Sequence, residues 1–175
     1  VLAMKSLASY SMYAYKDQLV DLSDHVNDTL DAENYNGVLE ELTTDDGKIY
    51  AQPYRNDFYL LLYNKDLFDE AGEAYPDNLT WDEYEALAKK MSDPSNQIYG
   101  SYHHYWYMLT LSLAAAQEGK DLLDPSYEYA LPQYERFVRM QEDESVLPFG
   151  TAKSTKMTYN SQFESGKTAM MPMGT

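Results

Sequence analysis

Residues 46–68 read DGKIYAQPYRNDFYLLLYNKDLF and contain the pattern that decides the fold. The Asp-Gly pair at the start predicts a turn, because glycine adopts a positive φ without strain. The extended segment after it ends at Pro53, which lacks the backbone N–H that a central strand needs. The continuously apolar run 58–63 predicts a parallel strand that is covered on both faces. Asn64 then predicts the N-cap of a short helix.

A second local signal lies at residues 80–83, which read TWDE and have the S/T-x-x-E pattern of a helix capping box. Apolar side chains follow on one face of the helix predicted there. Glu85 and Lys89 are one turn apart on the other face, which predicts a favourable ion pair.

Strand-like and helix-like segments alternate along the rest of the chain. Short strands are predicted at 1–4, 97–101 and 168–173. The run 105–117 is apolar nearly all round and predicts a buried helix. Further helices are expected over 6–16, within 27–42, from 124 onward and over 160–165. This alternation predicts an α/β fold with a mainly parallel sheet.

The charge balance narrows the classes of partner. Of 175 residues, 13 are Lys or Arg and 29 are Asp or Glu, so the formal net charge is −16. This disfavours nucleic acid and anionic membrane surfaces, which both bind proteins through positive charge. The absence of cysteine excludes disulfides, thiolate metal sites and a cysteine nucleophile. No apolar run reaches the roughly 18–20 residues of a membrane span.

The two ends of the sequence indicate a part of a longer protein. The chain opens with Val1 in an apolar run, without the initiating methionine and basic region of a signal peptide. It stops at Thr175 directly after another apolar run. We therefore expect ordered structure to continue beyond both ends.

Motifs of catalysis and cofactor binding are missing from the sequence. It contains neither the G-x-S-x-G elbow of serine hydrolases nor the glycine-rich loops that bind nucleotides. His103 and His104 are adjacent and have no further ligand three or four residues away, so they do not complete a zinc set. We expect no catalytic residue, no metal site and no cofactor.

Two clusters have the composition of a binding site. In the first, Arg55, Asn56, Asp57 and Phe58 offer a fork-shaped donor, an amide, a carboxylate and an aromatic face. Charged partners strengthen hydrogen bonds to vicinal hydroxyls, and an aromatic face covers the C–H side of a sugar ring. A polar turn closed by an ion pair between the arginine and the aspartate is the alternative for the same residues.

The second cluster is residues 102–106, which read YHHYW and follow the predicted strand 97–101. Ligands of open α/β sheets bind outside the carboxyl ends of the strands. We therefore expect His103 or Tyr105 to touch a ligand, and Trp106 to lie half in the core.

Motifs in a fixed order span nearly the whole chain. They are DGKIYAQPY at 46–54 followed by LYNKDLF at 62–68, TWDEY at 80–84, FESGKTAM at 163–170 and MG at 173–174. Together they resemble the bacterial extracellular solute-binding proteins of family 1, the maltose-binding-protein-like receptors of sugar ABC transporters.

The resemblance implies a type II periplasmic-binding-protein-like fold, in which two α/β lobes close on a ligand by hinge motion. It assigns residues 1–54 to the C-terminal part of lobe 1, up to the first hinge crossing. Residues 55–175 then correspond to part of lobe 2.

The resemblance also implies ligand contacts at particular positions. Asp57 matches an acidic residue after the hinge that bonds sugar hydroxyls in the maltodextrin receptor. His104, Tyr105 and Trp106 lie near the place where that receptor contributes a carboxylate and an aromatic ring.

A third set of implied contacts lies near the start of the chain. Met4, Lys5 and Ser6 stand where the maltodextrin receptor contributes a stacking tryptophan and polar contacts. Met4 departs from that tryptophan, which argues against a long α-glucan as the ligand.

By this resemblance the chain is the substrate-binding component of an ABC importer, not an enzyme, and binds a sugar or oligosaccharide between its lobes. It then works on the extracellular or periplasmic side of the cytoplasmic membrane, lipid-anchored in its native form, with the transporter's membrane subunits as partners. Two alternatives stay open. The acidic, tyrosine-rich composition also suits a polyamine or metal-complex receptor of the same fold, and Asp57 can serve as a catalytic carboxylate in a fragment of a carbohydrate-active enzyme.

Overall fold

The computed structural model describes residues 1–175 and divides into two compact units, Val1–Asp57 and Phe58–Thr175. Each unit has its own cluster of buried side chains and is described by itself. The lobe boundary after Tyr54 stays a prediction. None of the helices combines the length and the apolar character that crossing a membrane requires.

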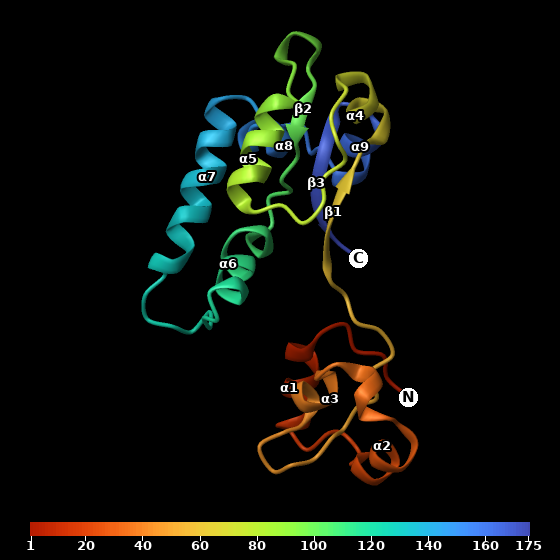
Figure 1. The fold of residues 1–175 in the computed structure, drawn as a ribbon. Coiled ribbons are helices and arrows are strands. Elements are labelled where there is room, and N and C mark those ends of the chain that lie inside the picture. Colours follow the sequence, from red (N-terminus) through yellow and green to blue (C-terminus); the bar gives the residue numbers. More distant parts are fainter. The chain divides into compact units, whose positions relative to one another are not determined.

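The unit Val1–Asp57 consists of short helices and loops (Figure 1). Its elements are α1 (Leu7–Ala14), α2 (Ser23–Thr29), the 3-10 helix η1 (Ala32–Tyr35) and α3 (Val38–Leu42). α1 confirms the helix predicted over 6–16. The core of this unit is small and is formed by Val26, Leu39 and Ile49.

Two other predictions for this unit have opposite outcomes. The turn is confirmed, because the Gly47 N–H donates to the Thr44 carbonyl at 2.8 Å and Gly47 has a φ of 77°. The predicted strand at 1–4 is wrong, since these residues are irregular and Val1 and Leu2 are exposed. A strand needs a neighbouring strand to satisfy its backbone groups, and this unit contains none.

A three-stranded sheet forms the centre of the unit Phe58–Thr175 (Figure 1). Its strands are β1 (Tyr59–Tyr63), β2 (Tyr99–Ser101) and β3 (Thr168–Gly174), in the order β1-β3-β2. β2 runs parallel to β3, whereas β1 runs antiparallel to it. The prediction of a mainly parallel sheet with 58–63 covered on both faces is therefore wrong for β1. As an edge strand, β1 leaves Leu60 and Leu62 exposed at alternate positions.

Helices cover both faces of this sheet. The helices of this unit are α4 (Lys65–Ala71), α5 (Trp81–Lys90), α6 (Leu111–Gln117), α7 (Leu131–Glu142), α8 (Phe149–Ser154) and α9 (Tyr159–Glu164), with 3-10 turns η2 (Pro94–Asn96), η3 (Tyr107–Leu109) and η4 (Glu128–Ala130). Met170 and Met171 are neighbours in β3 and so point to opposite faces. Met170 packs in a cluster with α4, α5 and α7, and Met171 packs in another with α8 and α9.

The predicted helix caps are confirmed. The Asn64 side chain accepts a hydrogen bond from the Asp66 N–H at 3.0 Å, and α4 ends at Gly72 with a φ of 67°. Thr80 and Glu83 form both hydrogen bonds of the capping box at the start of α5. These signals succeed because a cap satisfies helix-end N–H groups within a few residues of sequence.

The helix predicted over 105–117 needs correction. The structure has the short turn η3 and then α6, and the aromatic side chains of residues 105–107 are exposed. The Trp106 N–H donates to the His104 carbonyl at 2.8 Å, a tight turn that a continuous helix cannot contain. These exposed rings line a hollow beyond the end of β2.

The helix predicted from 124 also begins later. α7 starts at Leu131, and Pro132 lies in its first turn, where a missing N–H leaves no intrahelical bond unmade. α8 was not predicted at all, because its six residues show no apolar periodicity long enough to detect.

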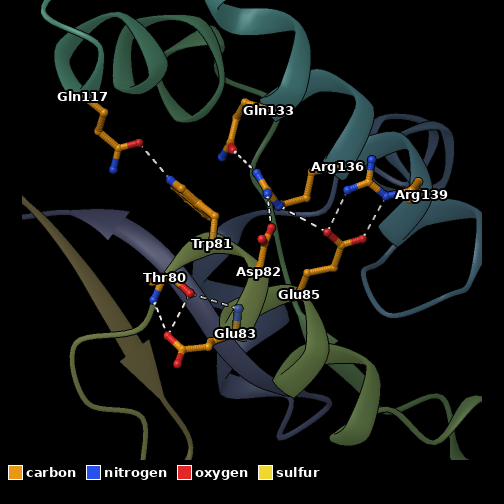
Figure 2. A network of polar contacts seen from close by, with 9 residues as sticks. All are labelled: Thr80, Trp81, Asp82, Glu83, Glu85, Gln117, Gln133, Arg136 and Arg139. Atoms are coloured by element: carbon orange, nitrogen blue, oxygen red, sulfur yellow. Dashed lines mark hydrogen bonds and ion pairs between the residues drawn. The ribbon is translucent and has the colours of Figure 1, made fainter.

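Ion pairs join α5 to α7 in an arrangement that the sequence did not predict (Figure 2). Glu85 pairs with Arg136 at 3.2 Å and with Arg139 at 2.9 Å. Lys89 instead pairs with Asp143 at 3.4 Å, so the predicted pair within α5 is wrong. Two guanidinium groups of α7 face the Glu85 carboxylate and compete with a single ammonium on its own helix.

Gly100 lets β2 approach α5 closely. A Cβ atom on this residue would overlap the backbone carbonyl of Ala88 in α5. The Ser92 hydroxyl bridges the two elements, since it donates to that carbonyl at 2.8 Å and accepts from the Gly100 N–H at 2.9 Å. This close approach brings the side chains of α5 next to the residues that follow β2.

Candidate functional site

A hollow of about 290 Å³ opens in the unit Phe58–Thr175 beyond the carboxyl end of β2. Its walls come from residues 103–107 and Thr110, from Tyr134, Phe137, Val138 and Gln141 of α7, and from Val146, Leu147 and Phe149. None of these side chains is acidic or carries a lysine or arginine charge. The size is at the lower end of the usual range for small-molecule pockets.

The backbone after β2 explains why side chains gather here. The Tyr102 N–H donates to the Met170 carbonyl at 3.0 Å, which continues the pairing of β2 with β3. The tight turn at Trp106 then directs the chain away from the sheet. Aromatic rings of this turn remain accessible at the mouth of the hollow: Tyr105 is 43% exposed, Trp106 39% and Phe149 of α8 47%.

His103 contacts both α5 and α7. Its Nε2 atom lies 2.7 Å from the Tyr84 hydroxyl, and its ring centroid lies 3.9 Å from that of Phe137. The residue as a whole keeps some exposure, but its Nδ1 atom is covered and has no hydrogen-bond partner. Burial lowers the pKa of His103 to about 3, so the imidazole is neutral at neutral pH.

Tyr84 is buried and its hydroxyl contacts two partners. One is His103, and the other is the hydroxyl of Ser101 at the end of β2. The Ser101 hydroxyl in turn donates to the Met170 carbonyl at 3.0 Å. Burial raises the pKa of Tyr84, so the phenol keeps its proton at neutral pH.

His104 points to a different set of partners. Its Nδ1 atom lies 2.9 Å from the Tyr102 hydroxyl, and its ring packs against Tyr105 and Trp106 at centroid distances of 4.2 and 4.4 Å. Burial lowers the pKa of His104 and raises the pKa of Tyr102 to about 12. Both side chains are therefore uncharged at neutral pH and support the aromatic wall.

The hollow combines aromatic faces with neutral polar atoms. Aromatic faces bind the C–H side of a hydroxylated ring, and imidazole, amide and hydroxyl groups exchange hydrogen bonds with its O–H groups. The unit contains no group of three or more His, Asp or Glu side chains placed to hold a metal ion, and neither does the other unit.

Comparison with known proteins identifies the relatives of this chain. The family model described as bacterial extracellular solute-binding protein matches residues 1–175. This chain belongs to that family. Membership confirms the resemblance found in the motifs, and the mixed α/β architecture is that of type II periplasmic binding proteins.

Solved and curated members of the solute-binding family agree with this assignment. A sugar transporter from Rhizobium etli, solved in an open conformation, is 35% identical with a TM-score of 0.88, and the match covers 98% of this chain and 44% of that one. An ABC substrate-binding protein from Listeria monocytogenes, solved in complex with cycloalternan, is 26% identical with a TM-score of 0.73 over 94% and 45% of the two chains. The arabinooligosaccharide-binding protein of Halalkalibacterium halodurans is 25% identical over 124 residues, which are 71% of this chain and 27% of that protein. The chain thus spans less than half the length of these relatives.

Of the predicted site residues, the structure gathers His103, His104, Tyr105 and Trp106 in one hollow. Phe58 belongs to the same unit but does not line the hollow. Its backbone carbonyl accepts a hydrogen bond from the Thr175 N–H at 3.0 Å.

The other predicted residues belong to the unit Val1–Asp57. Arg55 and Asp57 form an exposed ion pair with Nε and Oδ1 2.9 Å apart, which is the contact that the polar-turn alternative expects. Asn56 and Lys5 are exposed and Met4 is half-buried. The Ser6 side chain accepts from the Ser9 N–H at 3.3 Å and so caps α1.

Sequence reasoning missed the contribution of α7 to the hollow. Tyr134, Phe137, Val138 and Gln141 follow the i, i+3, i+4, i+7 spacing of one helix face. That spacing predicts a shared face, but it does not distinguish a face against the core from one beside a ligand. Phe149 had no signal, because the helix that carries it was not predicted.

A second hollow, of about 360 Å³, lies in the unit Val1–Asp57 and has the opposite character. Three tyrosines line it, Tyr10, Tyr15 and Tyr50, together with the carboxylates of Asp17, Glu41, Asp45 and Asp46. Lys48 approaches one of these carboxylates, that of Asp46, at 3.6 Å. The two units therefore present one neutral and one acidic hollow.

Proposed function

We propose that this chain is part of the sugar- or oligosaccharide-binding component of an ABC importer. The neutral hollow is its contribution to the ligand site from the second lobe. The observation that carries this proposal is the lining of the hollow, which joins exposed aromatic rings to uncharged polar atoms. A neutral polyhydroxylated ligand matches that chemistry, and the names of the relatives from R. etli and H. halodurans support a saccharide.

We also propose the lobe assignment and the remaining contacts. Residues 1–54 end lobe 1 at the first hinge crossing, and 55–175 belong to lobe 2. Residues 55–58 then donate and accept hydrogen bonds to sugar hydroxyls beside the hinge, with Asp57 as the central acceptor. Residues 4–6 contribute from lobe 1.

The proposed setting is the outer side of the cytoplasmic membrane, with the membrane subunits of the transporter as partners and a lipid anchor on the native protein. Membership of an extracellular solute-binding family supports this setting. The proposed role is binding without turnover. The pair of free carboxylates that glycoside hydrolysis needs is missing from the neutral hollow.

A thermal-shift screen of the chain tests the proposal. Its first arm contains maltose, D-mannitol, ribitol and an arabinooligosaccharide. A site with a Kd of about 1 mM, at about 10 mM ligand, adds about 1.4 kcal/mol to the free energy of unfolding. For a chain of this length the midpoint then rises by roughly 3–6 °C. Trp106→Ala should lose the shift, whereas Tyr15→Ala, which changes the other unit, should keep it.

The acidic hollow favours a second candidate function, a receptor for a polyamine, so spermidine and divalent cations form separate arms of the screen. A shift with spermidine that Tyr15→Ala abolishes and Trp106→Ala preserves would replace the sugar proposal by this candidate. If none of the sugars raises the thermal midpoint, while urea unfolding shows that the chain is folded, the sugar proposal is contradicted.

A further inference from the structure

The hydrogen-bond chain behind the hollow fixes where the proton of His103 resides. The chain ends at the Met170 carbonyl, which can only accept. The Ser101 hydroxyl therefore uses its single proton on that carbonyl, at 3.0 Å. Its oxygen is left to accept from its other partner, the Tyr84 hydroxyl.

The Tyr84 hydroxyl in turn determines which imidazole nitrogen carries the proton. Tyr84 also has a single proton and donates it to Ser101, so its oxygen accepts from His103 Nε2 across 2.7 Å. Nε2 must then carry the proton of the ring. A neutral imidazole has only one N–H, and burial keeps His103 neutral, so Nδ1 is a bare acceptor.

This bare acceptor has no donor within the protein. The Nδ1 atom of His103 is covered, and no hydrogen-bond partner reaches it. A buried acceptor without a donor destabilises the structure that contains it, and a ligand that supplies the donor recovers that loss. The hollow beside it contains no charged side chain, and its other titratable groups, His104, Tyr105, Tyr107 and Tyr134, are aromatic.

We propose that His103 Nδ1 accepts a hydrogen bond from a ligand hydroxyl, and that Tyr84 and Ser101 are positioning residues that hold this nitrogen unprotonated. The proposal rests on the proposed function and deepens it, because it states which hydrogen-bonding character the ligand must have. A ligand that donates an O–H is selected. A ligand that offers only acceptors at that position is rejected, since two lone pairs then face each other.

Three exposed rings line the same hollow as His103. Tyr105, Tyr107 and Tyr134 are 43%, 63% and 43% exposed, so their side chains can turn without unpacking the core. The proposal requires a movement beside the hollow that uncovers Nδ1 for the hydroxyl, and the exposed rings then cover the C–H faces of the ligand.

The tautomer itself is tested without any ligand. Two-bond ¹⁵N–¹H correlation spectra of the chain at neutral pH should show His103 protonated at Nε2 and unprotonated at Nδ1. In Ser101→Ala, Tyr84 loses its acceptor and donates to Nε2 instead, so the proton should move to Nδ1. Ser145→Ala is the matched control, because Ser145 is also fully buried but its hydroxyl donates to the Met140 carbonyl and takes no part in the hydrogen bonds of Tyr84. A proton on Nδ1 in the wild type, or an unchanged tautomer in Ser101→Ala, overturns the inference and leaves the proposed function standing.

The ligand preference is tested with D-mannitol and its hexa-O-methyl ether, which keeps the oxygen acceptors and loses every O–H. The wild type and Ser145→Ala should bind D-mannitol at least about tenfold more tightly than the ether. Ser101→Ala should lose most of that preference, because its Nδ1–H now donates, and the bulk of the methyl groups is the same for all three proteins. An equal preference in all three contradicts the role of Nδ1. If neither probe binds and the sugar screen is also silent, the proposed function fails and this inference fails with it.

Discussion

A single histidine can make folding depend on pH when its surroundings keep it neutral. His103 is such a residue, because its ring packs against Phe137 and its Nε2 is engaged by Tyr84. In the unfolded chain the same imidazole is free to bind a proton near its ordinary pKa of about 6.5. Because the unfolded chain binds this proton more readily than the folded one, acid lowers the free energy of unfolding.

His103 should make the free energy of unfolding fall in acid. The stabilising contribution of His103 is fully present above pH of about 6.5, and it is lost as pH falls toward about 3, the pKa in the folded state. Over that window the free energy of unfolding should fall by up to about 1.4 kcal/mol per pH unit on account of this residue. Urea unfolding of the wild type and His103→Gln between neutral and acidic pH measures it. Thr110→Val, a change in the same hollow without a titratable group, should keep the wild-type slope, and a His103→Gln slope equal to it contradicts the prediction.

Replacing Gly100 and Gly150 by alanine should change the stability of the protein in opposite directions. Gly100→Ala places a methyl group on the Ala88 carbonyl, so β2 must move away from α5 and stability should fall by about 3 kcal/mol or more. Gly150 lies in α8 with open space around the new methyl group, so Gly150→Ala should raise stability by roughly 0.5–1 kcal/mol. Denaturant midpoints measure both changes, and a neutral Gly100→Ala would show that the close approach of the two elements is not required.

Secondary-structure elements differ in how far local sequence determines them. The caps at Asn64 and Thr80 are confirmed because their hydrogen bonds close within three residues. The direction of β1 was wrong because its partner is β3, more than a hundred residues later, and an apolar run does not reveal its neighbour. The same contrast applies to the candidate site. The run 103–106 was predicted from its local composition, whereas only the tertiary fold places the face of α7 beside the neutral hollow.

The contact between α5 and α7 should depend strongly on one carboxylate. Glu85 pairs with two arginines (Figure 2). The side chain of Arg136 is only 13% exposed. Glu85→Gln leaves the Arg136 guanidinium with the exposed Asp82 carboxylate as its remaining ionic partner and deprives Arg139 of its own, so stability should fall by about 1–3 kcal/mol. Lys90→Gln removes an ion pair whose lysine is 63% exposed and should change stability by less than about 1 kcal/mol. Equal effects of the two changes in urea unfolding would contradict the partly buried character of the first pair.

The two units of the chain have hydrophobic cores of unequal size. The core of Val1–Asp57 is one small cluster, whereas Phe58–Thr175 has two clusters on the two faces of its sheet. No backbone N–H of residues 51–57 donates a hydrogen bond to another backbone group. The segment that joins the units therefore has neither a helix nor a sheet ladder to protect it.

Limited proteolysis should reveal this segment first. Arg55 is exposed in the unprotected stretch, whereas Arg136 and Arg139 lie within α7. An arginine-specific protease at low concentration should therefore cut early after Arg55 and release 1–55 and 56–175, because a protease needs extended, accessible backbone. Mass spectrometry identifies the products, and Arg55→Gln should remove this cut. Early cleavage within α7 instead would contradict the proposed order of stability.

The chain has only two tryptophans, and they stand in different surroundings. The indole N–H of Trp81 is engaged by Gln117 at 2.8 Å, whereas Trp106 stands at the mouth of the neutral hollow. With Trp81→Phe, the remaining emission comes from a fluorophore that water quenches until something covers it. A blue shift on adding a sugar then reports occupancy directly, and the same titration gives the dissociation constant without a label. The protein thus contains its own optical sensor, and only one indole has to be removed to read it.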